Sequence, residues 1–228
     1  RERGVMIGFD CSHSVGVVPH RFDEWDVDFA MWCGYKYLCG GPGAPAFLYL
    51  NGKFFECEPG LAGWFGCVKE RQFDLSLDFE HARSAGGWQV SSPGILGAAA
   101  VAGALDVIKD AGIDCIREKS LQMTEYMMFL ADELLDCAPY GFRVATPREP
   151  ERRGGHVALA RAEEALRIKE ALTLRGVIAD FRPPDIIRLA PSPLYNTYSD
   201  IRTVVTRMRD IIDTGEYEGF SGSRGPIS

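Results

Sequence analysis

The chain has 228 residues, of which 46% are hydrophobic and 25% are charged, and its formal net charge is −7. This size and composition are typical of one or two globular domains with a substantial core. The acidic balance argues against a nucleic acid or an anionic membrane surface as the main partner, and no apolar stretch approaches the roughly 18 residues of a membrane span.

The cysteines indicate a reducing compartment. There are seven, an odd number with irregular spacing and no CxxC pair. The four histidines do not cluster with them, so we expect neither a disulfide framework nor a metal site. Free thiols are typical of a cytoplasmic protein, which is the location we expect. The chain opens with Arg-Glu-Arg-Gly and runs directly into a strand pattern, so we also expect an upstream segment.

In the first part of the chain, short strands alternate with long connections. Three strands are predicted, at residues 5–10, 26–33 and 46–50. The first is apolar on both faces, as in a buried parallel sheet, and ends in Asp10. Lys36 closely follows the second, and an Asn51-Gly52 turn follows the third. Residues 53–90 read as irregular, and a loop of that length favours a functional role.

From residue 93 onward, helical and strand patterns interleave. Helices are predicted at 95–110, 114–137, 162–175 and 199–214, and strands at 142–146, 156–160, 177–181 and 186–189. This alternation predicts a small α/β domain beside a larger parallel sheet. The Gly/Ser-rich end, 221–228, is expected to fray.

Asp10 and Lys36 are the first candidates for chemistry, because ligands of open α/β sheets bind outside the carboxyl ends of the strands. A simple ion pair would explain them. A pyridoxal-phosphate enzyme also needs a lysine for the cofactor aldehyde and an acid facing the pyridine nitrogen. The acid keeps that nitrogen protonated, and the lysine must act part of the time as a free amine. Gly34, Gly40 and Gly41 would let backbone approach a bulky cofactor.

The motifs around these residues resemble kynureninase. The matching segments, in order and with closely matching spacing, are Gly8–Gly16, Val27–Ala30, Tyr35–Gly43, Gly63–Gly66, Arg153–His156, Arg175–Ile178 and Ile187–Asn196. The resemblance covers essentially the whole chain. It implies an α/β fold: the second half of a fold type I pyridoxal-phosphate large domain, with a mainly parallel sheet, over residues 1–92. A linking helix and a small α/β C-terminal domain would form residues 93–228.

The resemblance assigns a role to each motif residue of the first strands. Lys36 matches the lysine that bonds to the cofactor and later moves protons at the substrate α-carbon. Asp10 matches the acid on the pyridine nitrogen, and His13 matches a second residue in contact with the cofactor. Tyr35 matches a tyrosine that reaches the phosphate and assists proton transfer. The alternatives are a core histidine for His13 and a core aromatic for Tyr35.

Three further residues have implied roles at the phosphate and the substrate. Trp64 matches a tryptophan that the partner subunit of a homodimer supplies, and Arg188 matches the arginine that binds the substrate α-carboxylate. Ser92 stands where some family members have an asparagine near the phosphate, and a hydroxyl can still donate there. The alternatives are a packing aromatic in its glycine turn for Trp64 and a structural ion pair for Arg188. His20 and His81 read as surface or structural residues.

The implied activity is hydrolysis of L-kynurenine, or its 3-hydroxy form, to anthranilate or 3-hydroxyanthranilate and L-alanine. Family members are about twice this length and share active sites within a homodimer, so an upstream segment of the same protein is expected. Other readings stay open: another aryl amino acid as substrate, another fold type I lyase or transferase, or a half-chain inactive without its upstream segment. A cysteine desulfurase is disfavoured, because that family usually has a histidine where Tyr35 stands and a mobile cysteine loop.

Overall fold

A computed structural model describes residues 2–223, and the last part of the predicted frayed end, 224–228, lies outside them. The chain divides into two compact units, residues 1–113 and 114–228. Each unit is described by itself. None of the helices in the described part of the chain is long and apolar enough to cross a membrane.

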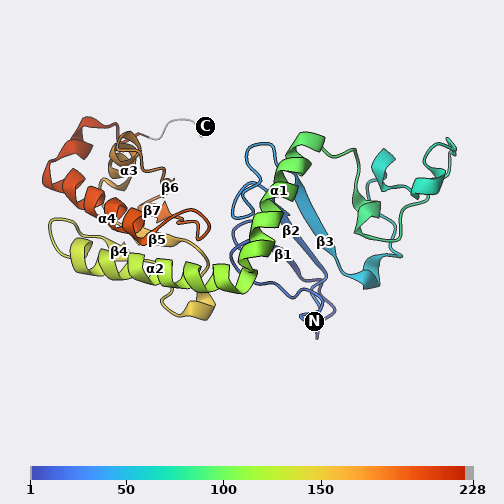
Figure 1. Ribbon diagram of the computed structural model, residues 1–228, viewed down its shortest axis with the longest axis horizontal. Coiled ribbons are helices and arrows are strands. Elements are labelled where there is room, and N and C mark those ends of the chain that lie inside the picture. The colour runs from blue at the N-terminus through green and yellow to red at the C-terminus, as the bar shows by residue number, and fades with distance from the viewer. Residues whose placement is uncertain (1, 224–228) are drawn as a thin grey trace. The chain divides into compact units, whose positions relative to one another are not determined.

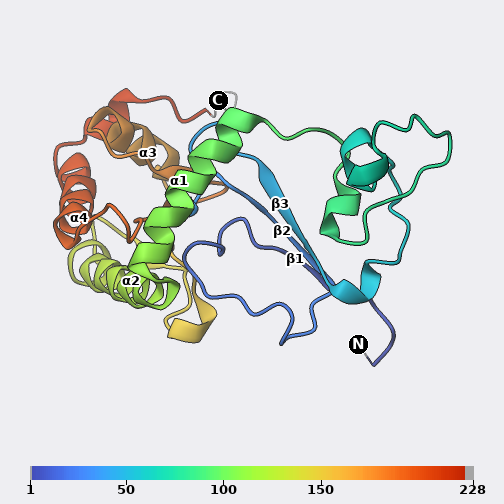
Figure 2. The same cartoon turned by 45° about the vertical axis from the view of Figure 1, so that its right-hand side comes forward.

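The first unit is built on a three-stranded sheet of order β1-β2-β3, drawn in blue in Figures 1 and 2. Its strands are β1 (Gly8–Asp10), β2 (Phe29–Cys33) and β3 (Ala46–Leu50). β1 and β2 are parallel, with Asp10 opposite Met31, whereas β3 runs antiparallel to β2. All three predicted strands are present, and the parallel pair is the one that carries Asp10 and leads to Lys36.

The expectation that the first strand is buried on both faces is wrong for this chain. Val5 and Met6 precede β1 as exposed residues, and Phe9 within it is 47% exposed. β1 is an edge strand of the sheet, hydrogen-bonded to β2 alone within the described residues. Its sequence therefore has the apolar character of a strand inside a larger sheet, without the neighbours that would bury it.

Helix α1 (Ile95–Ala111) packs against the rest of the first unit through Val101, which is 2% exposed. A Cβ added to Gly97 in the helix would lie 2.4 Å from the carbonyl oxygen of Gly43, so the helix and the glycine loop are in close contact. The helix that we expected to open the second domain thus lies within the first compact unit. The domain boundary at residues 92 and 93 stays a prediction.

Between β3 and α1, the chain is irregular, as predicted, and Figures 1 and 2 show it looping away from the sheet. It contains four short 3-10 helices: η1 (Gly52–Phe54), η2 (Trp64–Gly66), η3 (Lys69–Arg71) and η4 (Ala85–Trp88). Asn51 caps η1 by accepting a hydrogen bond from the Lys53 amide at 3.2 Å. The residues predicted as a simple turn therefore begin a helical turn.

The second unit packs helices against an antiparallel sheet of order β4-β5-β7-β6. Its strands are β4 (Arg143–Val144), β5 (Val157–Ala160), β6 (Asp180–Arg182) and β7 (Ile186–Leu189). Its helices are α2 (Ile113–Leu135), α3 (Ala165–Leu174), α4 (Tyr198–Asp213) and the 3-10 helices η5 (Pro150–Arg152) and η6 (Glu216–Gly219). One apolar core joins α2, α3, α4 and the sheet.

Two local features explain the limits of the elements in this unit. The predicted strand at 177–181 begins only at Asp180, because the Val177 amide still bonds to the Leu172 carbonyl at the end of α3. Helix α4 begins with a capping box, in which Thr197 and Asp200 bond to each other's backbone amides. Its apolar residues recur at helical spacing and are buried in the core.

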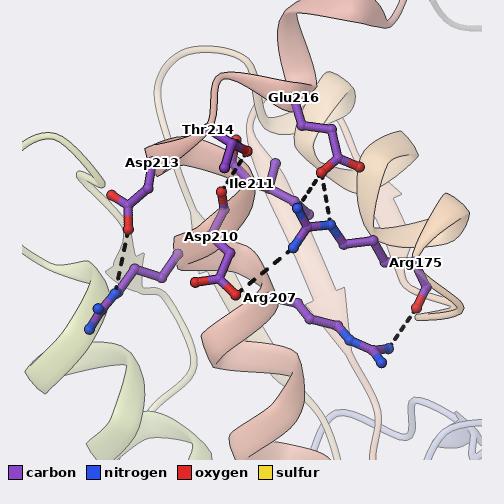
Figure 3. Close-up of polar contacts among 8 residues, drawn as sticks. Arg175, Arg207, Asp210, Ile211, Asp213, Thr214 and Glu216 are labelled. Carbon is purple, nitrogen blue, oxygen red and sulfur yellow. Dashed lines mark hydrogen bonds and ion pairs between the residues drawn. The ribbon is translucent and has the colours of Figure 1, made fainter.

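The C-terminal ends of α3 and α4 are joined by a cluster of charged side chains, which Figure 3 shows. The Arg175 guanidinium donates from Nε to Glu216 at 2.8 Å, and its Nη1 lies 4.0 Å from Asp210. Arg207 on α4 donates to the Arg175 carbonyl at 2.6 Å. These contacts give Arg175, the first residue of the motif segment Arg175–Ile178, a structural role.

Candidate functional site

Asp10 and Lys36 follow neighbouring parallel strands, as the sequence predicts. Asp10 is the last residue of β1, and Lys36 lies three residues beyond the end of β2. The Cys11 amide donates to the Met31 carbonyl at 2.8 Å, which continues the pairing past the end of β1. The two motifs are therefore placed at the same edge of the sheet, where ligands of such sheets bind.

The surroundings of Asp10 keep it ionised. Hydrogen bonds from Ser12, including its amide at 2.9 Å, lower the pKa of the Asp10 carboxyl most. The positive charges of Lys36 and His13 lower this pKa further. The carboxylate is exposed at the edge of the sheet. Asp10, Lys36 and His13 thus form one electrostatic group, and an exposed anion there suits a ring nitrogen that must carry a proton.

The loop that carries Lys36 is tight and closely packed. The Cys39 amide donates to the Lys36 carbonyl at 2.8 Å, and the Gly40 amide to the Gly34 carbonyl at 2.9 Å. A Cβ added to Gly34 would lie 2.7 Å from the Pro45 oxygen, and one added to Gly40 2.4 Å from Val101 Cγ2. These two glycines allow the loop to fit against β3 and α1. Lys36 itself is half-buried on this rigid support.

A third glycine joins the two motifs. Gly16, at φ +90°, ends the segment that begins at Asp10, and a Cβ there would lie 2.7 Å from the backbone carbon of Tyr37. Gly16, at the end of this segment, therefore lies directly against the residue that follows Lys36. This contact between segments about 20 residues apart defines the geometry of the candidate site.

Tyr35 points outward next to the lysine. It is 55% exposed, and Lys36 Nζ lies 5.7 Å from the centre of its ring. The Cys33 sulfur raises the pKa of Tyr35, first through its charge and then through a hydrogen bond. The phenol is therefore protonated at neutral pH and is suited to donate a proton. The alternative of a core aromatic is wrong, and so is that of a core histidine for His13, which is exposed.

Trp64 and Ser92 lie on the irregular segment that leaves the sheet. A Cβ on Gly63 would lie 2.1 Å from the Val90 oxygen, so the Trp64 turn packs against the stretch leading to Ser92. Trp64 is 49% exposed, its ring meets Phe73 edge-on at 5.4 Å, and it lines a hollow of about 430 Å³. Ser92 is exposed. Their roles toward a phosphate stay predictions.

Arg188 lies in the second unit and is engaged in an ion pair. It stands on β7 directly opposite Asp180 of β6, and its Nη2 lies 2.6 Å from the Asp180 carboxylate. Arg182 shares that carboxylate at 2.7 Å. The Arg188 side chain is 20% exposed. The ion pair that we considered as its alternative role is thus present, and binding of a substrate carboxylate stays a prediction.

His20 belongs to the site region, although its sequence gave no sign of it. Its Nε2 lies 3.0 Å from the hydroxyl of Ser14, which belongs to the segment between Asp10 and Gly16. His81, by contrast, is buried, with its Nε2 3.3 Å from the Phe55 carbonyl. Ser14 and His20 are six residues apart in a turn-rich stretch, and no periodic pattern indicates that their side chains meet.

Comparisons with known proteins agree with the motifs. The family model "Kynureninase C-terminal domain" matches residues 116–208. The chain is 48% identical over 227 residues to a kynureninase of Geobacillus thermodenitrificans and 50% identical over 228 residues to one of Bacillus thuringiensis. Each alignment covers 100% of this chain and 52% of the relative. The chain thus spans about half the length of these relatives, and its resemblance to the C-terminal part of kynureninases is confirmed.

Solved structures share the fold at low sequence identity. A cysteine desulfurase of Thermococcus onnurineus superposes with a TM-score of 0.75 at 19% identity, over 93% of this chain and 54% of that one. A cystine C–S lyase gives 0.71 at 19% identity, over 86% and 50% of the two chains. An alanine–glyoxylate aminotransferase of Nostoc gives 0.63 at 16% identity, over 93% and 55%. The expected α/β fold, half of a fold type I chain, is confirmed.

Proposed function

We propose that this chain, which matches the C-terminal half of kynureninases over its whole length, supplies the lysine and the acid of a pyridoxal-phosphate site for the hydrolysis of L-kynurenine or 3-hydroxykynurenine. The observation that carries the proposal is the placement of Asp10 and Lys36 at the ends of adjacent parallel strands. The ionised Asp10 and the half-buried Lys36 fit the two chemical needs of that cofactor. The products would be anthranilate, or its 3-hydroxy form, and L-alanine.

Each side chain has a defined task in this proposal. The cofactor, when bound, supplies an electron sink for the bond-breaking steps. Asp10 holds a proton on the ring nitrogen, since a neighbouring carboxylate favours the charged ring. Lys36 would hold the cofactor through its amine and would move the proton at the substrate α-carbon. Tyr35, a protonated phenol, donates toward the substrate carbonyl oxygen, a transfer typically worth about 10²–10⁴-fold.

Two side chains complete the proposed binding of substrate and cofactor. Arg188 would hold the substrate α-carboxylate through its planar guanidinium, and the substrate would compete with Asp180 for it. His13, whose charge already acts on Asp10, would contact the cofactor ring. Ser92 would donate its hydroxyl to the phosphate.

The proposal includes an upstream segment and a second subunit. The relatives are about twice as long, and Val5, Met6 and Phe9 leave apolar surface exposed around β1. An upstream segment adding strands beside β1 would cover that surface. Trp64, exposed on its own segment, would reach the cofactor phosphate of the other subunit of a homodimer. The seven free cysteines fit the proposed cytoplasmic location.

The test is borohydride trapping of the cofactor on the protein, followed by peptide mapping. This chain would be examined alone and co-expressed with the N-terminal half of the Geobacillus thermodenitrificans relative. We expect label on Lys36, none in Lys36→Ala, and unchanged label in Lys109→Ala, a control at an exposed lysine of α1. Label on another residue of the combined protein, or on none, would refute the assignment.

The identity of the substrate and the need for an upstream segment are tested separately. Release of fluorescent anthranilate from kynurenine, or of its 3-hydroxy form, identifies the substrate, and labelling of Lys36 without release of either indicates another aryl amino acid or another reaction of this fold. Strong Lys36 labelling in the isolated chain would contradict the need for an upstream segment.

A further inference from the structure

In the turn that follows Asp10 and contains His13, backbone amides bond to the carbonyls of Cys11 and Ser14. The amides of Ser14 and Val15 donate to the Cys11 carbonyl, each at 3.0 Å, and the amides of Val17 and Val18 donate to the Ser14 carbonyl at 3.1 and 2.8 Å. The Ser14 hydroxyl lies 3.3 Å from the Cys11 carbonyl. Ser14 is therefore the residue around which residues 11–18 fold.

His20 reaches back to this residue from outside the turn. Its Nε2 lies 3.0 Å from Ser14 Oγ, and its ring packs 5.0 Å from Phe22 and 6.2 Å from Trp25. Burial lowers the pKa of His20, and a hydrogen bond with the Val18 backbone opposes this only in part. The ring is therefore neutral at pH 7 and bonds to Ser14 in the middle of the turn and to Val18 at its end.

The support behind His20 is rigid. Phe22 packs on Tyr49 at 5.0 Å and on Trp32 at 6.1 Å, and Trp32 stacks on Phe47 at 6.0 Å. Trp32 belongs to β2, and Phe47 and Tyr49 belong to β3, so His20 connects the turn to the body of the sheet through Phe22. Gly16, at the other side of the same turn, touches the backbone of Tyr37, the neighbour of Lys36.

We propose that His20, acting through Ser14, is a positioning residue that fixes the Asp10–Gly16 turn against the loop of Lys36. This rests on the proposed function, because the consequence of the contact is the alignment of Asp10 with a cofactor linked to Lys36. His20 does not touch the cofactor. The hydrogen bond between His20 and Ser14 holds the turn that carries Asp10. Through Gly16, the same turn contacts the loop of Lys36.

The experiment uses this chain co-expressed with the N-terminal half of the Geobacillus thermodenitrificans relative. It measures cofactor affinity from the visible absorption band on titration with pyridoxal phosphate. The variants are Ser14→Ala, His20→Leu, their combination, and His20→Gln, whose side-chain amide can bond to the Ser14 hydroxyl in place of Nε2. Loss of one neutral hydrogen bond corresponds to a change of roughly 2–13-fold. We expect Ser14→Ala and His20→Leu each to weaken cofactor binding by about that factor. The double variant should bind as well as the more affected single variant, because both changes remove the same hydrogen bond. His20→Gln should stay within about twofold of wild type.

A matched control separates positioning from general loss of stability. Thr173→Ala removes a similar hydroxyl–carbonyl bond, 3.1 Å long, in the second unit, and should leave the affinity unchanged. Hydrogen exchange of the amides of residues 14–18 without cofactor should speed up in Ser14→Ala and His20→Leu, and stay slow in His20→Gln. Wild-type affinity in both single variants, or a His20→Gln variant as weak as His20→Leu, would overturn the proposal. A wild-type protein with no band at all would instead refute the proposed function.

Discussion

The buried Asp28 carboxylate, just before β2, offers a direct test of what holds the first sheet in register. The residue is 5% exposed; one oxygen accepts the Ile7 amide at 2.7 Å and the other lies 2.5 Å from Lys53 Nζ. Its own amide donates to the Ile7 carbonyl at 3.1 Å. Asp28 is thus bonded twice to the segment that enters β1. Replacing it leaves the half-buried Ile7 amide and the Lys53 ammonium without this partner.

The expected cost of the change follows from these contacts. A hydrogen bond to a charged group contributes about 1.5–3 kcal/mol. Lys53 is 40% exposed and has a second partner, Asp26, at 2.9 Å, so solvent screening limits its share to about 1 kcal/mol. We expect Asp28→Ala to cost about 2–4 kcal/mol, Asp28→Asn, which keeps an acceptor for Ile7, about 1–2 kcal/mol, and Lys53→Met at most about 1 kcal/mol.

Hydrogen exchange, read by mass spectrometry on peptides covering residues 5–12, measures the opening free energy of β1 in each variant. Lys109→Met, which removes an exposed pair 3.9 Å long on α1, is the control and should change nothing there. A cost for Asp28→Ala below about 0.5 kcal/mol, the usual range for a surface change, would refute the reasoning. So would a Lys53→Met variant that opens as easily as Asp28→Ala.

Three further predictions follow from single contacts. Gly16 has φ +90°, and Gly16→Ala places a Cβ 2.7 Å from the backbone carbon of Tyr37, so it should cost about 2 kcal/mol or more in thermal unfolding. Gly103→Ala, the control in open space on α1, should stabilise by about 0.5–1 kcal/mol. Thr197→Ala removes the capping box of α4 and should cost about 0.5–2 kcal/mol in urea unfolding, most of which Thr197→Ser should restore. Burial and Asp23 raise the pKa of Tyr49 from 10.0 to about 12. Because the folded state holds the phenol proton more tightly than the unfolded state, this proton stabilises the fold fully below pH 10, and the stabilisation decreases as the pH rises toward 12. The pH dependence of the unfolding free energy of Tyr49→Phe should lack this decrease.

The placement of Asp10 and Lys36 was predictable because it rests on rules of sheet topology. Asp10 ends one strand, Lys36 follows the next, and parallel neighbours present their carboxyl ends together. The glycines at 34 and 40 pack closely against Pro45 and Val101, whereas their expected role, close approach of backbone to a cofactor, stays a prediction. Periodicity likewise located α1 and α4 to within one or two residues of their ends.

Burial and pairing between elements were beyond the reach of local patterns. The apolar sequence of residues 5–10 describes a strand with neighbours on both sides, and the chain gives β1 only one. The pairing of Arg188 with Asp180 depends on the register between β6 and β7. The sequence placed β7 correctly but began β6 three residues too early. The Ser14–His20 contact depends on the path of a turn that has no repeating pattern.

The arrangement of the first unit explains how a short stretch of chain can hold Lys36 and Asp10 in fixed positions. Gly16 joins the Asp10 turn to the backbone beside Lys36, Gly34 and Gly40 fit the Lys36 loop against β3 and α1, and Asp28 secures the entrance to both strands. These contacts are backbone-to-backbone or buried, so they have little freedom to adjust. A cofactor joined to Lys36 would therefore meet Asp10 at a position fixed by the fold, and changes that loosen this frame should weaken cofactor binding before they unfold the protein.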